Sequence, residues 1–118
     1  MTRNRAYIVA AVLVLFVAAG GILIYATRSH GGQNVTINLS VTGASQMTPD
    51  NPTAHQNDKV TINVTSDTEG EVHLHGYDIH FDTKPGETVS HTFTADKTGT
   101  FEIEWELTSK HLGDFVVS

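Results

Sequence analysis

The stretch "KPGETVSHTFTADKTGTFEIEWEL", Lys84 to Leu107, decides the fold class of this chain. A Pro-Gly turn opens the stretch, and a second turn, "ADKTG", divides it into two segments in which apolar and polar residues alternate. In the second segment the glutamates take one set of alternate positions, and the other set is apolar: Phe101, Ile103, Trp105 and Leu107. A period of two indicates antiparallel strands with one face in a core and the other in solvent.

The same alternation continues on both sides of this stretch. It is clear in "NVTINLSVT" (34–42) and in "KVTINVT" (59–65), and shorter strands are predicted over 71–77, 79–82 and 114–117. Seven short strands without any helical period among them predict an all-β sandwich. The long polar connection over 43–58 predicts a Greek-key crossover between the two sheets.

The beginning of the chain differs from the rest. Residues 7–26 carry no charge, and a helix of that length crosses a hydrocarbon core of about 30 Å. A cleaved signal peptide is the alternative, but the bulky Ile24 stands three positions before the expected cleavage site. The sequence therefore predicts a single-pass membrane protein. Its expected parts are a cytoplasmic tail (1–6), a transmembrane signal anchor (7–26), a linker (27–33) and one outer domain (34–118).

Charge sets the expected orientation and partners. Arg3 and Arg5 precede the apolar segment, which favours a cytoplasmic N-terminus and an extracytoplasmic, periplasm-facing domain. All thirteen acidic residues follow residue 31, against four lysines, so this domain is not expected to attract nucleic acid or anionic lipid. The expected partners are the lipid bilayer, through the N-terminal helix, and a protein that the sequence does not identify.

Catalytic motifs are absent from the sequence. It has no cysteine, no nucleophile motif and no glycine-rich phosphate loop. The glutamates of the strand over 100–107 share one face, which indicates a solvated surface rather than acid–base catalysis. We therefore expect no enzymatic activity.

Four motifs in order along the outer domain resemble a known family: "DKVTINVTSD", "EVHLHGYDI", the stretch quoted first, and "HLGDFVV". They resemble membrane-anchored cupredoxin-like domains and, more distantly, the copper-bearing domain of haem–copper oxidases. The resemblance implies a cupredoxin-like Greek-key β-sandwich. It also implies one histidine ligand at His75, or at His73, and a second at His111 in the last loop.

The other two ligands that the resemblance implies are missing. Trp105 stands where the family has its cysteine, and Leu112 stands nearest to the axial methionine. A blue-copper centre needs a copper–thiolate bond, and a binuclear copper centre needs two thiolates. The sequence therefore predicts the scaffold without either of these redox centres.

Two interpretations of "HLHGYDIH" (73–80) remain open. In the first, four histidines converge and bind Cu(II), or less favourably Zn(II), with Asp78 or Asp82 as a further ligand or as an orienting group. The four predicted ligands are His73, His75, His80 and His111. The domain would then be a module that holds or senses a divalent metal without electron transfer.

In the second interpretation the same segment is an ordinary strand. Val72 and Leu74 then face the core, while His73, His75 and Tyr77 form its outer face. The domain would be a metal-free structural or protein-interaction sandwich, as an accessory subunit of a membrane complex. The remaining two histidines of the domain, His55 and His91, are expected to be isolated polar residues under either interpretation.

Overall fold

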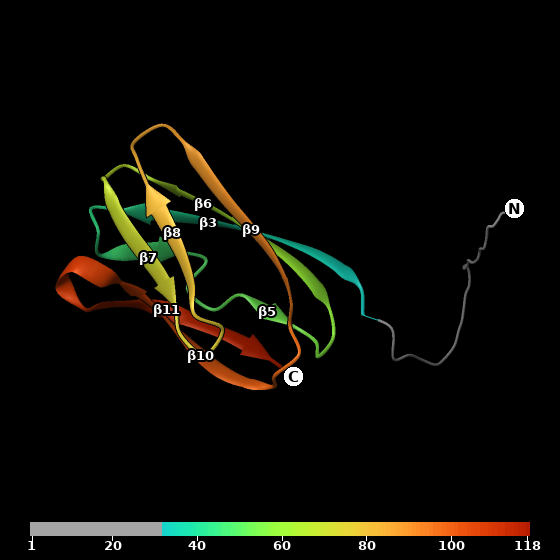
Figure 1. Cartoon of the computed structure of the whole chain (residues 1–118). Helices are drawn as coiled ribbons and strands as arrows, with labels where there is room; N and C mark the ends of the chain where they lie inside the picture. The colour runs from blue at the N-terminus through green and yellow to red at the C-terminus, as the bar shows by residue number, and fades with distance from the viewer. Residues whose placement is uncertain (1–31) are drawn as a thin grey trace, which may run out of the picture. The chain divides into compact units, whose positions relative to one another are not determined.

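The computed structural model describes residues 32–118 (Figure 1). The predicted cytoplasmic tail, the predicted transmembrane helix and most of the predicted linker lie outside the described residues. Between residues 32 and 118 we find no helical segment with the length and hydrophobicity that a membrane span requires.

The described residues form two β-sheets that pack face to face (Figure 1). The four-stranded sheet has the order β4-β3-β6-β9 and consists of β3 (Asn34–Thr42), β4 (Gln46–Thr48), β6 (Lys59–Ser66) and β9 (Thr88–Thr94). The five-stranded sheet has the order β5-β11-β10-β7-β8 and consists of β5 (Thr53–Ala54), β7 (Gly70–Leu74), β8 (Ile79–Thr83), β10 (Gly99–Trp105) and β11 (Lys110–Val117). Neighbouring strands run antiparallel, except that β3 is parallel to β6 and β5 is parallel to β11.

The predicted β-sandwich is thus confirmed, with two strands more than the seven that the sequence predicted in this part of the chain. Both additional strands, β4 and β5, lie in the polar connection over 43–58. Because β4 belongs to one sheet and β5 to the other, this connection does cross between the sheets. Strands of two or three residues are too short to show alternation, which is why the sequence predicted only a loop here.

Alternation along the strands builds the core. The apolar positions of both sheets point inward, where Val60, Val72 and Phe115 have no exposed surface. Trp105 is 2% exposed, so the prediction that it belongs to the core is confirmed. Its ring lies directly on Gly70, where an added Cβ would stand 2.2 Å from the Cζ2 atom of Trp105. Glycine at position 70 therefore gives the indole its place at this end of the sandwich.

Leu107 does not share the core face, which corrects the sequence prediction. Strand β10 ends at Trp105, and the chain enters a short 3-10 turn, η1 (Glu106–Thr108). The change from a period of two to a helical turn rotates the Leu107 side chain outward, and the residue is 72% exposed. The alternating pattern of the sequence continues through this position although the strand does not.

Tyr77 is a second correction. Strand β7 ends at Leu74, three residues before the predicted end, because residues 75–78 form the turn to β8. In this turn Gly76 has a φ of +82° and lies against the Phe101 ring. Tyr77 therefore packs inward against Phe101, with 4.9 Å between ring centroids, and not on the outer face. Its hydroxyl donates to the backbone carbonyl of Lys97 at 2.7 Å.

The outer face of the four-stranded sheet is polar and almost uncharged. Lys59 is the single Lys, Arg, Asp or Glu in the four described strands of this sheet. The outward side chains bond one another across the strands, as between Thr61 Oγ1 and Thr92 Oγ1 (2.9 Å) and from Asn63 Nδ2 to Asn38 Oδ1 (2.9 Å). The charged groups of the domain are concentrated elsewhere.

Trp105→Ala is expected to destabilise the domain strongly. Losing a buried Trp removes transfer free energy and leaves a cavity, at a cost of about 3–5 kcal/mol. Leu107→Ala is the matched control, because an exposed side chain far from special features changes stability by less than about 0.5 kcal/mol. Denaturant unfolding followed by circular dichroism measures both. Equal midpoints for the two variants would contradict the observed strand register.

Candidate metal site

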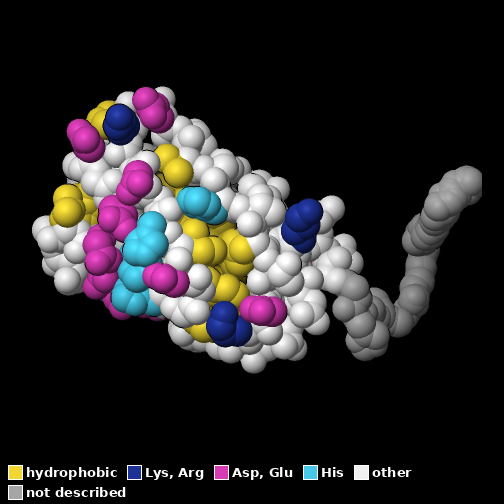
Figure 2. All heavy atoms as spheres, in the orientation of Figure 1, with side chains coloured by type: hydrophobic (Ala, Val, Ile, Leu, Met, Phe, Trp, Pro, Cys, Tyr) yellow, Lys and Arg dark blue, Asp and Glu magenta, His cyan; other side chains and the backbone are white. Residues whose placement is uncertain are grey.

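Histidines and acidic side chains gather on the outer face of the five-stranded sheet (Figure 2). Strand register aligns them in one row across four strands: His80 on β8 faces His73 on β7, His73 faces Glu104 on β10, and Glu104 faces His111 on β11. His73 points outward because its neighbours in β7 are core residues. We call this surface the histidine face. It comprises Glu71, His73, His75, Asp78, His80, Glu102, Glu104, Glu106, His111 and Asp114.

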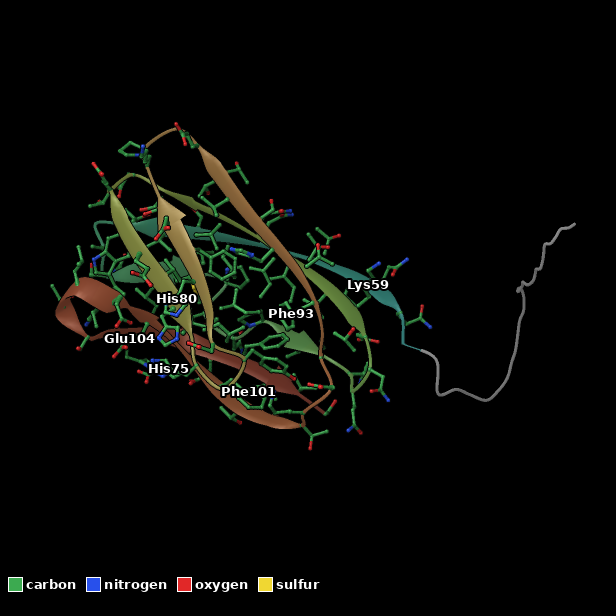
Figure 3. The ribbon with its side chains drawn as sticks, viewed as in Figure 1. Lys59, His75, His80, Phe93, Phe101 and Glu104 are labelled. Atoms are coloured by element: carbon green, nitrogen blue, oxygen red, sulfur yellow. The ribbon has the colours of Figure 1, made fainter. Side chains whose placement is uncertain are left out.

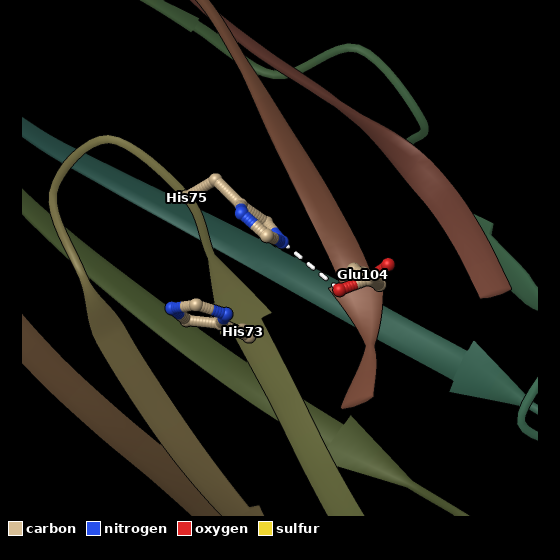
Figure 4. A group of neighbouring side chains, drawn as sticks. All are labelled: His73, His75 and Glu104. Atoms are coloured by element: carbon tan, nitrogen blue, oxygen red, sulfur yellow. Dashed lines mark hydrogen bonds and ion pairs between the residues drawn. The ribbon is translucent and has the colours of Figure 1, made fainter. Parts of the chain in front are cut away.

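Residues 32–118 contain two possible metal-binding groups, and His73, His75 and Glu104 form the less exposed one, here called the inner group (Figure 4). One ligand atom of each residue lies within 4.8 Å of the others. His75 Nε2 is 2.9 Å from Glu104 Oε1, and the ring centroids of His73 and His75 are 4.3 Å apart. The side chains of His73 and Glu104 are 14% and 16% exposed, so the group lies partly below the surface.

His73 also belongs to a second group, here called the outer group, with Asp78 and His80. The Oδ1 atom of Asp78 is 3.0 Å from the Nε2 atoms of both histidines. The rings of His73 and His80 stack at 4.2 Å with an interplanar angle of 9°. Asp78 sits in the β7–β8 turn with a φ of +54°, a conformation that Asp tolerates better than most residues, and its side chain is 81% exposed.

The shared residue, His73, has an unsatisfied nitrogen. Its Nε2 atom faces Asp78, but its buried Nδ1 atom has no hydrogen-bond partner. Glu106 Oε1 lies 3.2 Å from Nδ1, in a geometry that does not make a hydrogen bond. Leaving a buried polar atom unpaired costs about 1–3 kcal/mol. A nitrogen lone pair in this position is therefore suited to a further ligand.

Carboxylates bond the other histidines of this face, and two of the resulting hydrogen-bonded groups, His80 and Asp78, have shifted pKa values. A hydrogen bond from His80 to Glu71, aided by one to Asp78, raises the pKa of His80 above its ordinary value. Hydrogen bonds from His73 and His80 lower the pKa of Asp78. None of the ion pairs on the histidine face involves a lysine in the described part of the chain. Six carboxylates thus meet only imidazoles, and the face attracts cations.

The structure separates His111 from the other three predicted ligands. It lies on β11, one strand beyond Glu104, and belongs to neither group. Its Nδ1 atom is 2.9 Å from Glu102 Oε2, and its Nε2 atom is 3.6 Å from Asp114 Oδ2. The hydrogen bond to Glu102, followed by the charge of Asp114, raises the pKa of His111.

The remaining predicted candidates divide in the same way. Asp78 lies in the outer group, whereas Asp82, its alternative, lies in neither group. His55 bonds the Ser118 hydroxyl and His91 packs edge-on against Phe81, so neither reaches the histidine face.

Glu104 is the residue that sequence analysis missed. The pattern assigned it to a solvated face together with Glu102 and Glu106, and nothing in the sequence distinguishes the three. The distinguishing information is the pairing of β10 with β7, which sets Glu104 opposite His73. A sequence pattern shows which residues share a face but not which strand lies alongside.

The donor atoms decide which copper chemistry fits. At the two positions where the resemblance implied sulfur ligands, Trp105 and Leu112 are buried core residues. The residues present therefore do not fit a blue-copper or a binuclear centre. Both groups on the histidine face offer imidazole nitrogen and carboxylate oxygen, a set that suits Cu(II) and Zn(II).

Comparison with known proteins supports the fold. No protein-family model matches the chain, and no curated protein sequence matches it either. Among solved structures, the chain is similar to the apo form of a copper-binding protein, with a TM-score of 0.61, 18% identity, and coverage of 78% of this chain and 93% of that one. It is also similar to a chain of a haem–copper terminal oxidase dimer, with a TM-score of 0.60, 15% identity, and coverage of 79% and 76%. The described domain has a cupredoxin-like fold.

The raised pKa of His111 gives a prediction that is independent of any metal. Glu102→Gln removes the carboxylate that favours the imidazolium form, so the pKa of His111 falls toward the ordinary value, and the Asp114 charge keeps part of the shift. In the wild type this bond stabilises the fold below the unfolded pKa of about 6.5, and the stabilisation is lost as the pH rises through the higher folded value. Titration of the His111 ring signals by NMR measures the change, and an unaltered midpoint would show that Glu102 is not the cause.

Proposed function

We propose that this cupredoxin-like domain binds one divalent metal ion on its histidine face, with copper as Cu(II) preferred. The observation that carries the proposal is the unpaired, buried Nδ1 atom of His73 at the junction of two groups, each of which has two imidazoles and one carboxylate. A histidine placed only for solubility would expose both nitrogens to water. Here the ring is held in place by Asp78, and Glu106 lies beside it.

Copper is preferred over zinc for two reasons. Sites of nitrogen and oxygen ligands bind Cu(II) more tightly than Zn(II) in the usual affinity order of divalent metals. Likeness to a copper-binding protein and to a haem–copper oxidase chain supports the same choice. Zinc is the second candidate, because imidazole nitrogen and carboxylate oxygen also bind Zn(II).

Binding, rather than electron transfer or catalysis, is the proposed role. The chain has no cysteine, so it has no thiolate to make the copper–sulfur bond of a blue-copper centre. The neighbouring carboxylates act as orienting groups. Glu71 bonds the Nδ1 atom of His80, so the Nε2 atom of His80 faces Asp78 of the outer group. Such second partners fix the tautomer and increase the basicity of a metal-binding imidazole.

The alternative is a metal-free interaction domain. It is favoured by the carboxylate partners that His73, His75, His80 and His111 already have in the described structure. Under this alternative the histidine face is an acidic docking surface for a basic protein segment, in an accessory subunit of a membrane complex.

A membrane anchor and an extracytoplasmic location complete the proposal. The uncharged segment over 7–26 and the arginines before it support a single-pass anchor with its N-terminus in the cytoplasm. A metal-binding domain in that position meets metal ions outside the cytoplasm first.

Titration of the purified 118-residue chain with Cu(II) tests the binding proposal. We expect one tight site per chain with weak visible absorption and the wide hyperfine splitting of a nitrogen–oxygen site. His73→Ala removes the ligand common to both groups and is expected to weaken binding by about 100-fold or more, beyond the effect of losing an orienting group. Binding weakens as the pH falls, because protons compete for the imidazole nitrogens.

His91→Ala and His111→Ala are the matched controls, since each removes one histidine from outside the two groups. Both are expected to bind Cu(II) like the wild type. Weak binding at several sites, unchanged by His73→Ala, would reject the metal site and favour the interaction domain. A loss of binding in His111→Ala alone would show that the resemblance, and not the observed geometry, identifies the ligands.

The proposed topology has its own test, which uses the absence of cysteine from the chain. A membrane-impermeant maleimide on intact cells is expected to label Glu87→Cys, in an exposed turn of the domain, and not Thr2→Cys. Both variants should be labelled after the cells are lysed. Labelling of Thr2→Cys on intact cells would show the opposite orientation, with the N-terminus outside.

A further inference from the structure

The two metal-binding groups share His73 but differ in their access to solvent. The outer group contains Asp78, which is 81% exposed, and His80, which is 45% exposed. The inner group contains His75, which is 41% exposed, and Glu104, which is 16% exposed. The main difference lies between the two carboxylates, so an ion arriving from solution meets Asp78 before Glu104.

A neutral His73 ring cannot serve both groups at once. A neutral imidazole has one nitrogen that carries a proton and one that offers a lone pair. One His73 ring therefore binds one ion in one group at a time, and the groups are alternative positions for a single ion. The ring of His73 lies between the other two imidazoles, 4.2 Å from the His80 ring and 4.3 Å from the His75 ring.

We propose that the outer group takes up the metal ion first and that His73 then passes it to the inner group, where it is held. This inference rests on the proposed function and adds the route by which the site is loaded and emptied. Exchange of Asp78 and His80 for His75 and Glu104 requires no rearrangement of the sheet, because a ligand atom of His73 already lies within 4.8 Å of those of both sets. The Glu104 carboxylate is less exposed than that of Asp78, so its attraction for an ion is less screened by water and salt.

A loading group has a kinetic signature that a ligand of the final site lacks. If Asp78 acts in uptake, its loss slows binding and leaves the release rate nearly unchanged. The dissociation constant then rises through slower binding, because Asp78 also holds the His73 ring. If Asp78 is a ligand of the held ion, its loss speeds release and raises the dissociation constant. The two roles are therefore separable in one variant.

Asp78→Asn is the test variant. Asparagine keeps the size of the side chain and tolerates the φ of +54°, but it loses the charge. Asp82→Asn is the matched control, because Asp82 is also exposed, lies on the adjacent strand β8 and belongs to neither group. Glu104→Gln makes the same change of charge in the inner group. Unfolding midpoints of all variants establish that they are folded.

The experiment uses the full 118-residue chain and Cu(II) supplied as its glycine complex in a stopped-flow instrument. Quenching of the fluorescence of Trp105, the single Trp of the chain, follows binding. Release is followed after mixing the copper-loaded chain with excess EDTA. Calorimetry and counting of EPR spins give the dissociation constant and the number of ions per chain.

We expect one ion per chain. Asp78→Asn slows binding by about tenfold, in the range that removal of a steering charge produces. Its release rate stays near that of Asp82→Asn, whose binding and release rates both stay near the wild-type values. Glu104→Gln weakens binding mainly through faster release. His80→Gln, a second change in the outer group, repeats the kinetic pattern of Asp78→Asn.

Three results would overturn the inference while the proposed function stands. These are a binding rate in Asp78→Asn equal to that in Asp82→Asn, a dissociation constant raised by faster release in Asp78→Asn, and two ions per chain at saturation. Absence of saturable Cu(II) binding by the wild type is a different result, because it rejects the proposed function itself and the loading route with it.

Discussion

The contact of the Trp105 ring with Gly70 is the constraint on which the site depends. It joins the end of β10 to the beginning of β7 inside the sandwich, and it leaves one register for the two strands, with Trp105 opposite Val72. Side chains of a strand alternate between faces, so an inward Trp105 forces Glu104 outward, beside the outward His73. A slip of β10 by one residue would turn Trp105 outward and Glu104 into the core. The position of the candidate site therefore follows from a packing contact on the opposite side of the same sheet.

Much of this fold is present in the sequence pattern, and the exceptions have physical causes. The strands over 34–42 and 59–65 and the burial of Trp105 follow from alternation alone. Leu107 and Tyr77 were placed on the wrong faces because a turn interrupts the strand at each point, and alternation does not report where a strand ends. For the candidate site, "HLHGYDIH" (73–80) supplies four of its five residues: three predicted histidine ligands and Asp78, which the sequence indicates as a further ligand or an orienting group. Glu104 was not foreseen, because which strand lies beside β7 depends on the tertiary fold. His111 matches the resemblance in sequence but lies apart from the other histidines in space.

The position of the two groups shows how this chain departs from the scaffold that it shares with copper proteins. The resemblance implied ligands at the end of the sandwich, in the loop between the last two strands. Trp105 and Leu112 occupy those positions with buried apolar side chains, so that end of the molecule is part of the core. The imidazoles stand instead on the outer face of the five-stranded sheet, on β7, β8 and the turn between them, with a carboxylate from β10 (Figure 3). A site on a sheet face is shallow and open to solvent, which suits reversible binding better than it suits the protection of a redox centre.

The contrast between the two outer faces gives the domain an electric dipole moment. Six carboxylates lie on the histidine face, whereas the four strands of the opposite sheet carry Lys59 as their one charge. The dipole is directed across the sandwich, whose inner faces pack about 10 Å apart. An electric field exerts a torque on such a molecule. Beside a negatively charged surface the histidine face turns toward the bulk solution, and the opposite face, with Lys59 among threonines and asparagines, turns toward the surface.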